Sequence, residues 1–301
     1  MTTEPDKFAM KGMVKMKSEM MAQIFSEAQP YVRKYRGKTV VIKYGGNAMI
    51  NEDLKRAVMS DLNMLVLMGI RVVLVHGGGP EINKMLDKIG KESVFIDGLR
   101  YTDDETMEVV QSVLAGKVNK DLVALINAMG GKAIGMCGMD GKLLTCKKHE
   151  AAKDLGFVGD VVNVNPTIIN MALEAGYIPV IATVGVDKDG TSYNINADTA
   201  AAEIAVALGA AKIVSMTDVV GILRDKNDES TLIEEIEIGE VDALIEDGII
   251  AGGMIPKIEG CVYGINKGMS EAVIIDGRVP HSILLEIFSD RGSGTLFYKK
   301  V

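Results

Sequence analysis

The fold of this chain is decided between residues 39 and 79, where TVVIKYGG (39–46) is followed by EDLKRAVMSDLNMLVLMG (52–69) and RVVLVHGGG (71–79). The first and third segments are short β-branched and apolar runs that end in glycines, which is typical of strands. The middle segment has a helical spacing of apolar residues and closes on a glycine. Strand, helix and strand in this order predict an α/β protein with a mainly parallel sheet.

The same alternation continues along the chain. Apolar runs recur at 132–136, 177–182, 211–216 and 271–276, and helical spacing recurs at 102–130 and 196–209. Continuously apolar strands are typical of a sheet covered on both faces, so we expect a three-layer sandwich around the sheet. Three further segments are expected to form peripheral hairpins or edge strands, namely 141–149, 186–195 and 294–301.

An amphipathic helix precedes the first strand. It covers residues 17–35, and Pro30 should kink or break it. We therefore divide the chain into an N-terminal helical extension, 1–37, and two lobes on one continuous sheet, 38–190 and 191–301.

Composition excludes several classes of protein. The chain has 301 residues, with 33 Lys and Arg against 41 Asp and Glu, and 48% of it is hydrophobic, so disorder is excluded. An acidic balance without a basic run argues against nucleic acid, and no apolar run approaches the ~20 residues that span a membrane. Cys137, Cys146 and Cys261 are odd in number and lack CxxC spacing, which argues against disulfides and structural zinc and favours the cytoplasm.

Glycine clusters follow the predicted strands, and ligands of open α/β sheets bind at the carboxyl ends of strands. No GxxxxGK[ST] motif occurs, and Gly77-x-Gly79 lacks a third glycine because residue 82 is Ile, so P-loop and standard dinucleotide sites are not expected. Lys43 stands two residues before Gly45 and Gly46, where loop amides and a lysine would form an anion cradle for a phosphate. The alternative is a plain turn beside a solvated lysine.

The second cluster, Gly77–Gly79, would let a ligand approach the backbone closely, although a flexible turn would look the same. We interpret His76, just before it, as a packing residue at the strand end rather than a general base. Arg100 suits a substrate carboxylate through bidentate hydrogen bonds, and Asn194 and Asn196 offer neutral donors.

Two charged residues begin predicted helices. Asp198 precedes an alanine-rich stretch, and its residue type alone favours an N-cap. Lys257 follows Gly252 and Gly253 and lies at the unfavourable end of the helix dipole, which indicates that it serves an anion rather than the helix.

These blocks together resemble the amino acid kinase family. IKYGG, VHGGG, GLRYTD, NINAD, TDVVGIL, GGMIPK and GTLF occur in order between Val40 and Phe297. GLRYTD with NINAD is similar to the branch that phosphorylates the side-chain carboxylate of N-acetyl-L-glutamate in arginine synthesis, using ATP with Mg²⁺. A carboxylate nucleophile is already ionised at neutral pH, so such a reaction needs alignment and charge neutralisation rather than a base.

The resemblance implies a role for each matching residue. Lys43 and Lys257 would flank the transferring phosphoryl group, with Asp198 holding them in place and no metal ligand supplied by the protein. Acetylglutamate would bind Gly78, Gly79, Arg100 and Asn194, with Arg100 and Asn194 on its α-carboxylate. The nucleotide and its phosphates would lie on Gly45, Gly46, Asp218, Val219, Gly221, Leu223, Ile249 and Ala251.

The resemblance extends to the arginine-inhibited members. In these a kinked N-terminal helix joins dimers into a hexamer, and His281, Glu286 and Gly292 match positions around bound arginine. A homohexamer inhibited by arginine is therefore expected, and a nitrogen-signalling protein is left open as a partner. Two alternatives stay open: a kinase of carrier-linked aminoadipate, which should show a basic rim, and a non-catalytic amino acid sensor.

Overall fold

The structure is a computed structural model that describes residues 19–300. Residues 1–18 and 301 lie outside the described part, so about half of the predicted N-terminal extension is not covered. Among the described residues, no helix is both long enough and apolar enough to cross a membrane.

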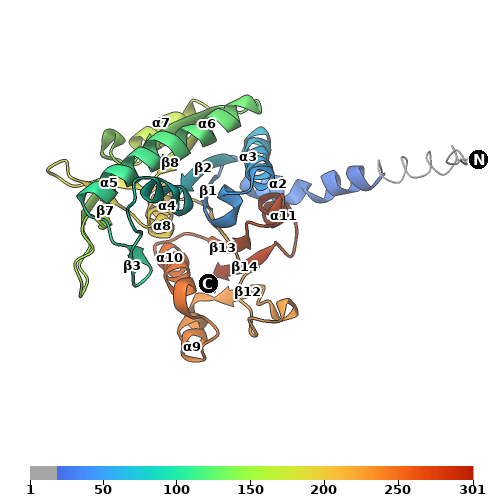
Figure 1. Ribbon diagram of the computed structural model, residues 1–301. Helices are drawn as coiled ribbons and strands as arrows, with labels where there is room; N and C mark the ends of the chain where they lie inside the picture. Colours follow the sequence, from blue (N-terminus) through green and yellow to red (C-terminus); the bar gives the residue numbers. More distant parts are fainter. Residues whose placement is uncertain (1–18, 301) are drawn as a thin grey trace, which may run out of the picture.

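A large sheet forms the centre of the described chain (Figure 1). Its strands are β1 (Thr39–Tyr44), β2 (Arg71–His76), β5 (Ala133–Cys137), β8 (Ile178–Ala182), β11 (Lys212–Thr217), β12 (Glu235–Glu237), β13 (Glu271–Asp276) and β14 (Gly294–Tyr298). Their order is β12-β14-β13-β11-β1-β2-β8-β5, and every neighbouring pair is parallel except β13 with β14. The predicted α/β fold with a mainly parallel sheet is confirmed.

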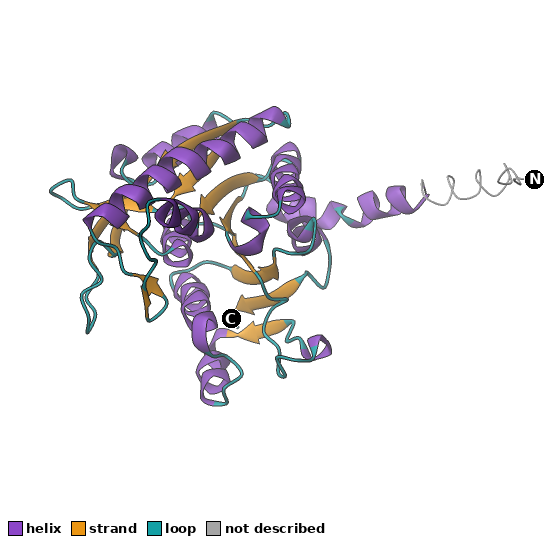
Figure 2. Cartoon of the chain, viewed as in Figure 1, coloured by secondary structure: helices purple, strands orange, loops and turns teal. Residues whose placement is uncertain are grey.

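Helices cover both faces of this sheet (Figure 2). One face carries α3 (Glu52–Leu67), α4 (Gly79–Lys88), α5 (Asp104–Gln111), α6 (Asn119–Ala128) and α11 (Ser282–Phe288). The other carries α7 (Thr167–Glu174), α8 (Ala197–Ala207), α9 (Val241–Glu246) and α10 (Ile255–Asn266). Alternate strand residues enter opposite cores, as Val40 and Ile42 do against Val41.

Smaller elements surround the β5 and β8 end of the molecule. A second sheet has the order β10-β9-β6-β7, and its strands are β6 (Leu144–Lys148), β7 (Gly159–Val164), β9 (Val184–Val186) and β10 (Ser192–Asn194). A hairpin is formed by β3 (Phe95–Ile96) and β4 (Leu99–Arg100). Short 3-10 turns lie at Gly46–Met49, Asp140–Lys142, Glu229–Thr231, Ile238–Glu240 and Gly252–Met254, and a π-helix, η2, joins α5 to α6 over Ser112–Val118.

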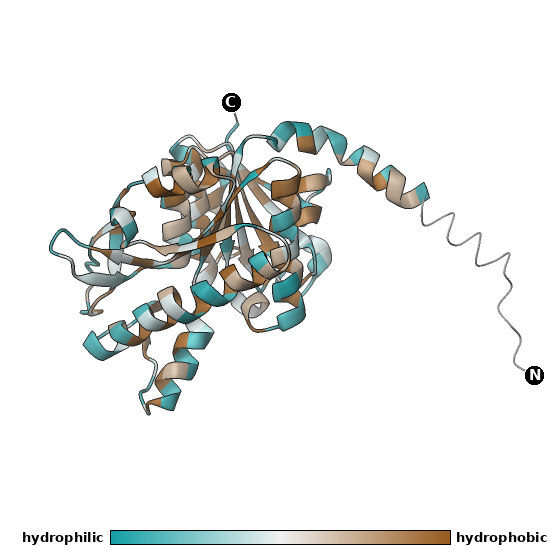
Figure 3. Cartoon of the chain, turned by 90° about the horizontal axis from the view of Figure 1, so that it is seen from above, coloured by the Kyte–Doolittle hydropathy of each residue, from teal (hydrophilic) through white to brown (hydrophobic). Residues whose placement is uncertain are grey.

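The N-terminal helix breaks where the sequence predicts it. Residues 19–27 are helical, Ala28 is a turn, and α2 (Gln29–Tyr35) begins with Pro30 in its first turn. The first piece projects away from the body and exposes apolar side chains, whereas α2 lies beside α11 (Figures 1 and 3). Tyr35 is buried and donates a hydrogen bond to Glu271 of β13.

One peripheral strand was predicted wrongly. Residues 294–301 were expected at an edge or in a hairpin, but β14 pairs with β13 on one side and with β12 on the other. The reason is β12, a strand of only three residues that the apolar pattern does not reveal. By covering the outer side of β14, it moves β14 inside the sheet.

The topology fixes where a ligand can bind. The strands β2, β8 and β5 lie on one side of β1, and β11 and β13 lie on the other side. Ligands of open sheets bind in the crevice at the carboxyl ends of the strands next to such a switch point. Lys43 and His76 stand at the carboxyl ends of β1 and β2, and both therefore lie at this edge of the sheet.

Candidate active site

Lys43 is buried at the end of the central strand. Its Nζ lies 3.0 Å from Asp198 Oδ1, and its side chain is only 8% exposed. A Cβ atom at Gly45 would lie 3.3 Å from this ammonium group. The absence of a side chain at Gly45 therefore leaves space beside the lysine. Burial lowers the pKa of Lys43; Asp198 opposes this effect, and Lys257 adds to it.

Asp198 lies in the first turn of α8 and forms an ion pair with each of the two lysines, Lys43 and Lys257. Lys257 Nζ, from the first turn of α10, lies 2.8 Å from Asp198 Oδ2, and Ser215 Oγ donates to Asp198 Oδ1 at 3.1 Å. Burial alone would raise the pKa of Asp198, but Lys43 and Lys257 outweigh it and lower the pKa to about 2. The carboxylate is therefore ionised at every pH at which the protein would work.

The N-cap interpretation of Asp198 was wrong. The cap of α8 is Asn196, whose side chain accepts hydrogen bonds from the backbone amides of Asp198 and Thr199. Asn and Asp cap helices about equally well, so residue type could not distinguish the two positions. Because Asn196 takes the cap, the carboxylate of Asp198 is available to the lysines.

A cavity of about 180 Å³ opens beside this charged cluster. Its lining includes Gly77, Gly78 and Gly79 from the second glycine cluster, Arg100 from β4 and Asn194 from β10. Arg100 is buried, and its guanidinium lies 4.6 Å from the ring centre of Phe95. Asn194 donates one amide hydrogen to Thr102 Oγ1 at 3.2 Å, and its second amide hydrogen is left for a ligand. The fold thus gathers the predicted acetylglutamate ligands in one place.

Two residues that the sequence did not single out hold Arg100 in position. Its Nη1 donates to Ser93 Oγ at 2.8 Å, and its Nη2 donates to Asn83 Oδ1 at 2.7 Å. Asn83 lies one turn into α4 from Gly79, a spacing that gives no sign of contact with a strand residue 17 positions further along the chain. A fixed guanidinium can present its remaining donors to a carboxylate.

A second cavity, of about 360 Å³, adjoins the first and reaches Lys257. Its lining includes Asp97, Asp198, Lys257 and His149, and it shares Leu99 with the first cavity. A small molecule held by its carboxylate at Arg100 can therefore extend toward the cations on Asp198.

The predicted nucleotide residues lie on the β11 side of the crevice. Asp218 follows β11, and its carboxylate faces Gly46, where a Cβ atom would come within 2.4 Å of Oδ1. Gly46 also has a φ of +69°, so this position requires glycine for two reasons. The other predicted members occupy the loops after β11 and before α10, namely Val219, Gly221, Leu223, Ile249 and Ala251.

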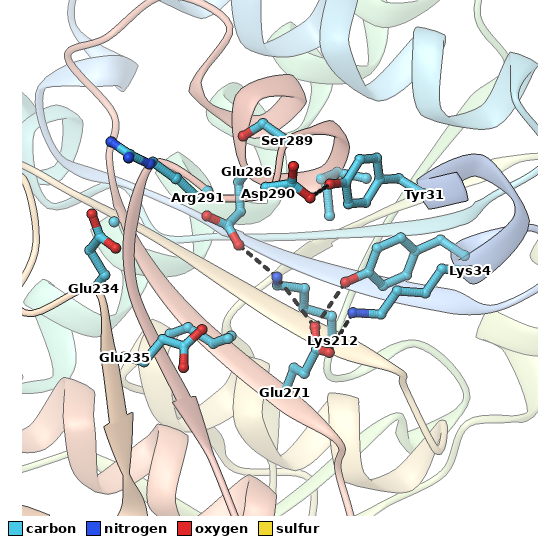
Figure 4. Close-up of a pocket in the computed structure, with 15 residues that line it drawn as sticks. Tyr31, Lys34, Lys212, Glu234, Glu235, Glu271, Glu286, Ser289, Asp290 and Arg291 are labelled. Atoms are coloured by element: carbon cyan, nitrogen blue, oxygen red, sulfur yellow. Dashed lines mark hydrogen bonds and ion pairs between the residues drawn. The ribbon is translucent and has the colours of Figure 1, made fainter. Parts of the chain in front are cut away.

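The residues predicted to surround arginine are only partly brought together. Glu286 and Gly292 line a separate cavity of about 360 Å³ between α2, α11 and β14 (Figure 4). Glu286 Oε1 lies 2.6 Å from Lys212 Nζ, and Ser293 N donates to Glu286 Oε2 at 2.9 Å. His281 does not line this cavity, because its ring turns to Asp61 of α3, with Nδ1 2.6 Å from Oδ1.

Comparison with known proteins agrees with this geometry. The model of the amino acid kinase family matches residues 38–276. An acetylglutamate kinase from Brachyspira hyodysenteriae is 56% identical over 278 residues, which cover 92% of this chain and 96% of that protein.

Solved structures agree at the level of the fold. The N-acetylglutamate synthase of Neisseria gonorrhoeae complexed with coenzyme A and N-acetyl-glutamate is 27% identical with a TM-score of 0.82, over 93% of this chain and 64% of that one. Its complex with coenzyme A and L-arginine is 25% identical with a TM-score of 0.78, over 93% and 66%. The fold, the crevice and the family match together show that the chain belongs to the amino acid kinase family, in its acetylglutamate kinase branch.

Proposed function

We propose that the protein transfers the γ-phosphoryl group of ATP to the side-chain carboxylate of N-acetyl-L-glutamate, giving N-acetyl-L-glutamyl 5-phosphate and ADP in arginine biosynthesis. The observation that carries this proposal is the convergence of Lys43 and Lys257 on Asp198 beside the cavity that Arg100 lines. Relatives 54–57% identical over most of the chain carry the name acetylglutamate kinase. We therefore do not favour a carrier-linked aminoadipate kinase or a non-catalytic sensor.

The chemistry follows from the charges. The attacking carboxylate is ionised at neutral pH, since its ordinary pKa is ~4.3, so no general base is needed. Two lysines on one carboxylate leave one net positive charge to stabilise the negative charge that spreads over the phosphoryl oxygens. Amides of the loop at Gly45 and Gly46 add neutral donors on the nucleotide side.

Magnesium belongs to the same proposal. In the part of the chain that the structure describes, no group of three His, Cys, Asp or Glu side chains could hold a metal ion. We propose that Mg²⁺ arrives bound to the phosphates of ATP, where it would neutralise phosphate charge. The chain's own contribution is then to align the two substrates and to supply the lysines.

An acceptor comparison tests the function. The purified protein is incubated with ATP, Mg²⁺ and hydroxylamine, which traps acyl phosphates as hydroxamates, and with N-acetylglutamate, glutamate, aspartate or N-acetylaminoadipate. We expect N-acetylglutamate to be preferred by far. Equal or faster trapping with N-acetylaminoadipate would favour the aminoadipate alternative, and no trapping with any acceptor would favour the sensor.

We also propose that arginine inhibits the enzyme at the cavity beside α2. The cavity is lined by more acidic than basic side chains, including Glu234, Glu235, Glu271, Glu286 and Asp290 (Figure 4). Such a lining suits the guanidinium and ammonium groups of arginine. A related synthase has been solved with L-arginine, which supports the same ligand here.

The N-terminal extension would transmit this signal within a hexamer. Tyr31 contacts Asp290, and Lys34 contacts Glu271, so α2 forms one wall of the cavity. We propose that the exposed apolar helix before α2 joins dimers into a homohexamer. A nitrogen-signalling partner and a cytoplasmic location stay predictions.

A further inference from the structure

His76 is a buried polar residue that the proposed chemistry does not use. It ends β2, directly before the glycines that line the substrate cavity, and it is fully buried. The sequence suggested packing at the strand end, but both ring nitrogens are hydrogen bonded. Nδ1 lies 2.9 Å from the carbonyl oxygen of Gly77, and Nε2 lies 3.0 Å from Nδ2 of Asn119.

Asn119 fixes which nitrogen of His76 carries the proton. Its Nδ2 also faces the carbonyl oxygens of Val180, at 2.8 Å, and Met136, at 3.3 Å, so this end of the amide must be the donor. Its Oδ1 accepts from Lys120 Nζ at 3.0 Å, which agrees with the same orientation. Nε2 of His76 must then be an acceptor, so the proton is on Nδ1 and is donated to the Gly77 carbonyl.

This hydrogen bond orients the peptide between Gly77 and Gly78. In a trans peptide the C=O and N–H groups point in opposite directions. With the Gly77 oxygen held toward the buried imidazole, the Gly78 N–H points away from it. Gly77 N donates to Tyr44 O at 3.3 Å, so both the N–H and the C=O of Gly77 are hydrogen bonded.

The π-helix supports the other side of Gly78. A Cβ atom at Gly78 would lie 2.6 Å from Leu114 Cδ2 and 3.4 Å from Val118 Cγ2, so η2 packs directly on this backbone. Asn119 is the residue at which η2 ends. Gly78 is also the N-cap of α4, one of the four positions whose amides have no partner inside a helix.

We propose that His76 and Asn119 are positioning residues that hold the Gly77–Gly78 peptide so that the Gly78 N–H faces the acceptor carboxylate and the transferring phosphoryl group. This inference rests on the proposed function. In this arrangement the π-helix η2 positions Asn119. The imidazole of His76 must be neutral, because its Nε2 accepts a hydrogen bond. Burial lowers the pKa of His76 to about 4, which agrees with that requirement.

Two substitutions of His76 separate the two hydrogen bonds. In His76→Asn, the amide nitrogen can take the place of Nδ1 and still donate to the Gly77 oxygen. In His76→Gln, the amide reaches the place of Nε2 and can meet Asn119, but the bond to Gly77 is lost. The two variants have comparable polarity, so each is the matched control for the other.

We expect His76→Asn to keep kcat within about threefold of the parent and His76→Gln to lose about tenfold to a hundredfold, because a transition-state donor that is misplaced should cost less than the roughly hundredfold to thousandfold loss caused by removing one. The KM for N-acetylglutamate should change less than kcat in either variant, because Arg100 would still hold the substrate. A purely structural role would instead lower Tm in both variants and leave kcat alone. Equal kcat in both variants, with an active parent enzyme, would overturn the inference alone, whereas an inactive parent would overturn the proposed function and the inference with it.

A second measurement determines the tautomer of His76 in protein that keeps this residue, so it does not depend on whether a His76 variant folds. The chain has three histidines, so ¹⁵N-histidine labelling gives few signals, which substitution of His149 or His281 assigns. Two-bond ¹⁵N–¹H correlation spectra should show His76 with its proton on Nδ1 and without titration between pH 8 and about pH 5.5. A proton on Nε2, or titration near the ordinary value of ~6.5, would contradict the hydrogen-bond chain.

Discussion

Lys43 and Lys257 share one carboxylate but differ in their exposure to solvent. The side chain of Lys43 is 8% exposed and that of Lys257 is 26% exposed. Removing Lys43 leaves a cavity beside a buried carboxylate, so its loss affects stability as well as catalysis. Lys257 is therefore the cleaner probe of the proposed role.

We predict that Lys257→Ala lowers kcat by about a hundredfold to a thousandfold, because the loss of one transition-state stabilising group typically costs this much. The KM for N-acetylglutamate should change little, since that substrate is held at Arg100. Steady-state kinetics of Lys257→Ala and of Lys267→Ala, an exposed lysine at the C-cap of the same helix, give the comparison. Turnover of folded Lys257→Ala within a few-fold of the parent would remove Lys257 from the phosphoryl site.

Arg100→Lys tests the other end of the substrate. Lysine keeps the charge but cannot bond Ser93 and Asn83 and also offer a planar fork to a carboxylate. We predict that the KM for N-acetylglutamate rises about tenfold or more, while kcat stays within a few-fold, because a hydrogen bond to a charged group contributes about 1.5–3 kcal/mol. An unchanged KM would mean that Arg100 does not contact the substrate.

At the scale of elements, a buried carboxylate joins α3 to α11. Asp61 is fully buried, its Oδ1 meets His281, and its Oδ2 has no hydrogen-bond partner among the described residues. Burial raises the pKa of Asp61 from its ordinary 3.8 to about 6, although the bond to His281 acts in the opposite direction. The folded protein therefore holds this proton more tightly than the unfolded chain.

The sign of the pH dependence follows. Between pH 4 and pH 6 the folded state binds more protons at Asp61, so this residue makes the free energy of unfolding fall as pH rises, by up to about 3 kcal/mol. Asp61→Asn should remove that decrease. Urea unfolding of the parent, of Asp61→Asn and of the exposed control Asp121→Asn at several pH values checks this. Parallel curves for the parent and Asp61→Asn would show that the pKa is not raised.

The sequence predicts those elements that a pattern of neighbouring residues specifies. β1 and β2 were predictable because Val40–Ile42 and Val72–Leu74 are continuous apolar runs, each followed by glycines three residues later. The task of Asp198 was not predictable from residue type, because Asn196 competes for the same cap. The support of Arg100 and of His76 comes from Asn83 and Asn119, whose partners lie 17 and 43 residues away, and polar residues on a helix give no sign of such contacts.

At the scale of the whole molecule, the chain exposes an apolar helix beyond its catalytic body. Met20, Met21, Ile24 and Phe25 are each more than half exposed. An apolar stripe of this kind on a surface helix indicates a protein partner. The proposed hexamer gives it one, namely a second copy of the same helix.

We predict that deletion of residues 1–27, which leaves α2 and its contacts intact, converts hexamers into active dimers with weaker arginine inhibition. Light scattering gives the mass, and activity against arginine concentration gives the inhibition. In the full chain, Ile24→Asp with Phe25→Asp should act in the same way, and Gln23→Ala with Glu27→Ala is the polar control. Deleted protein that stayed hexameric and equally sensitive to arginine would contradict both proposals.

The central claim is that a side-chain carboxylate attacks the γ-phosphorus of ATP in this crevice. It is tested most directly with N-acetylglutamate that carries ¹⁸O at both oxygens of its side-chain carboxylate, incubated with ATP, Mg²⁺ and hydroxylamine. Hydroxylamine attacks the carbonyl carbon of an acyl phosphate, so the bridging oxygen leaves with phosphorus. We predict that ³¹P NMR of the released phosphate shows one ¹⁸O atom in each molecule formed. Phosphate without the label would contradict the account, because the carboxylate oxygen would then never have bonded to phosphorus.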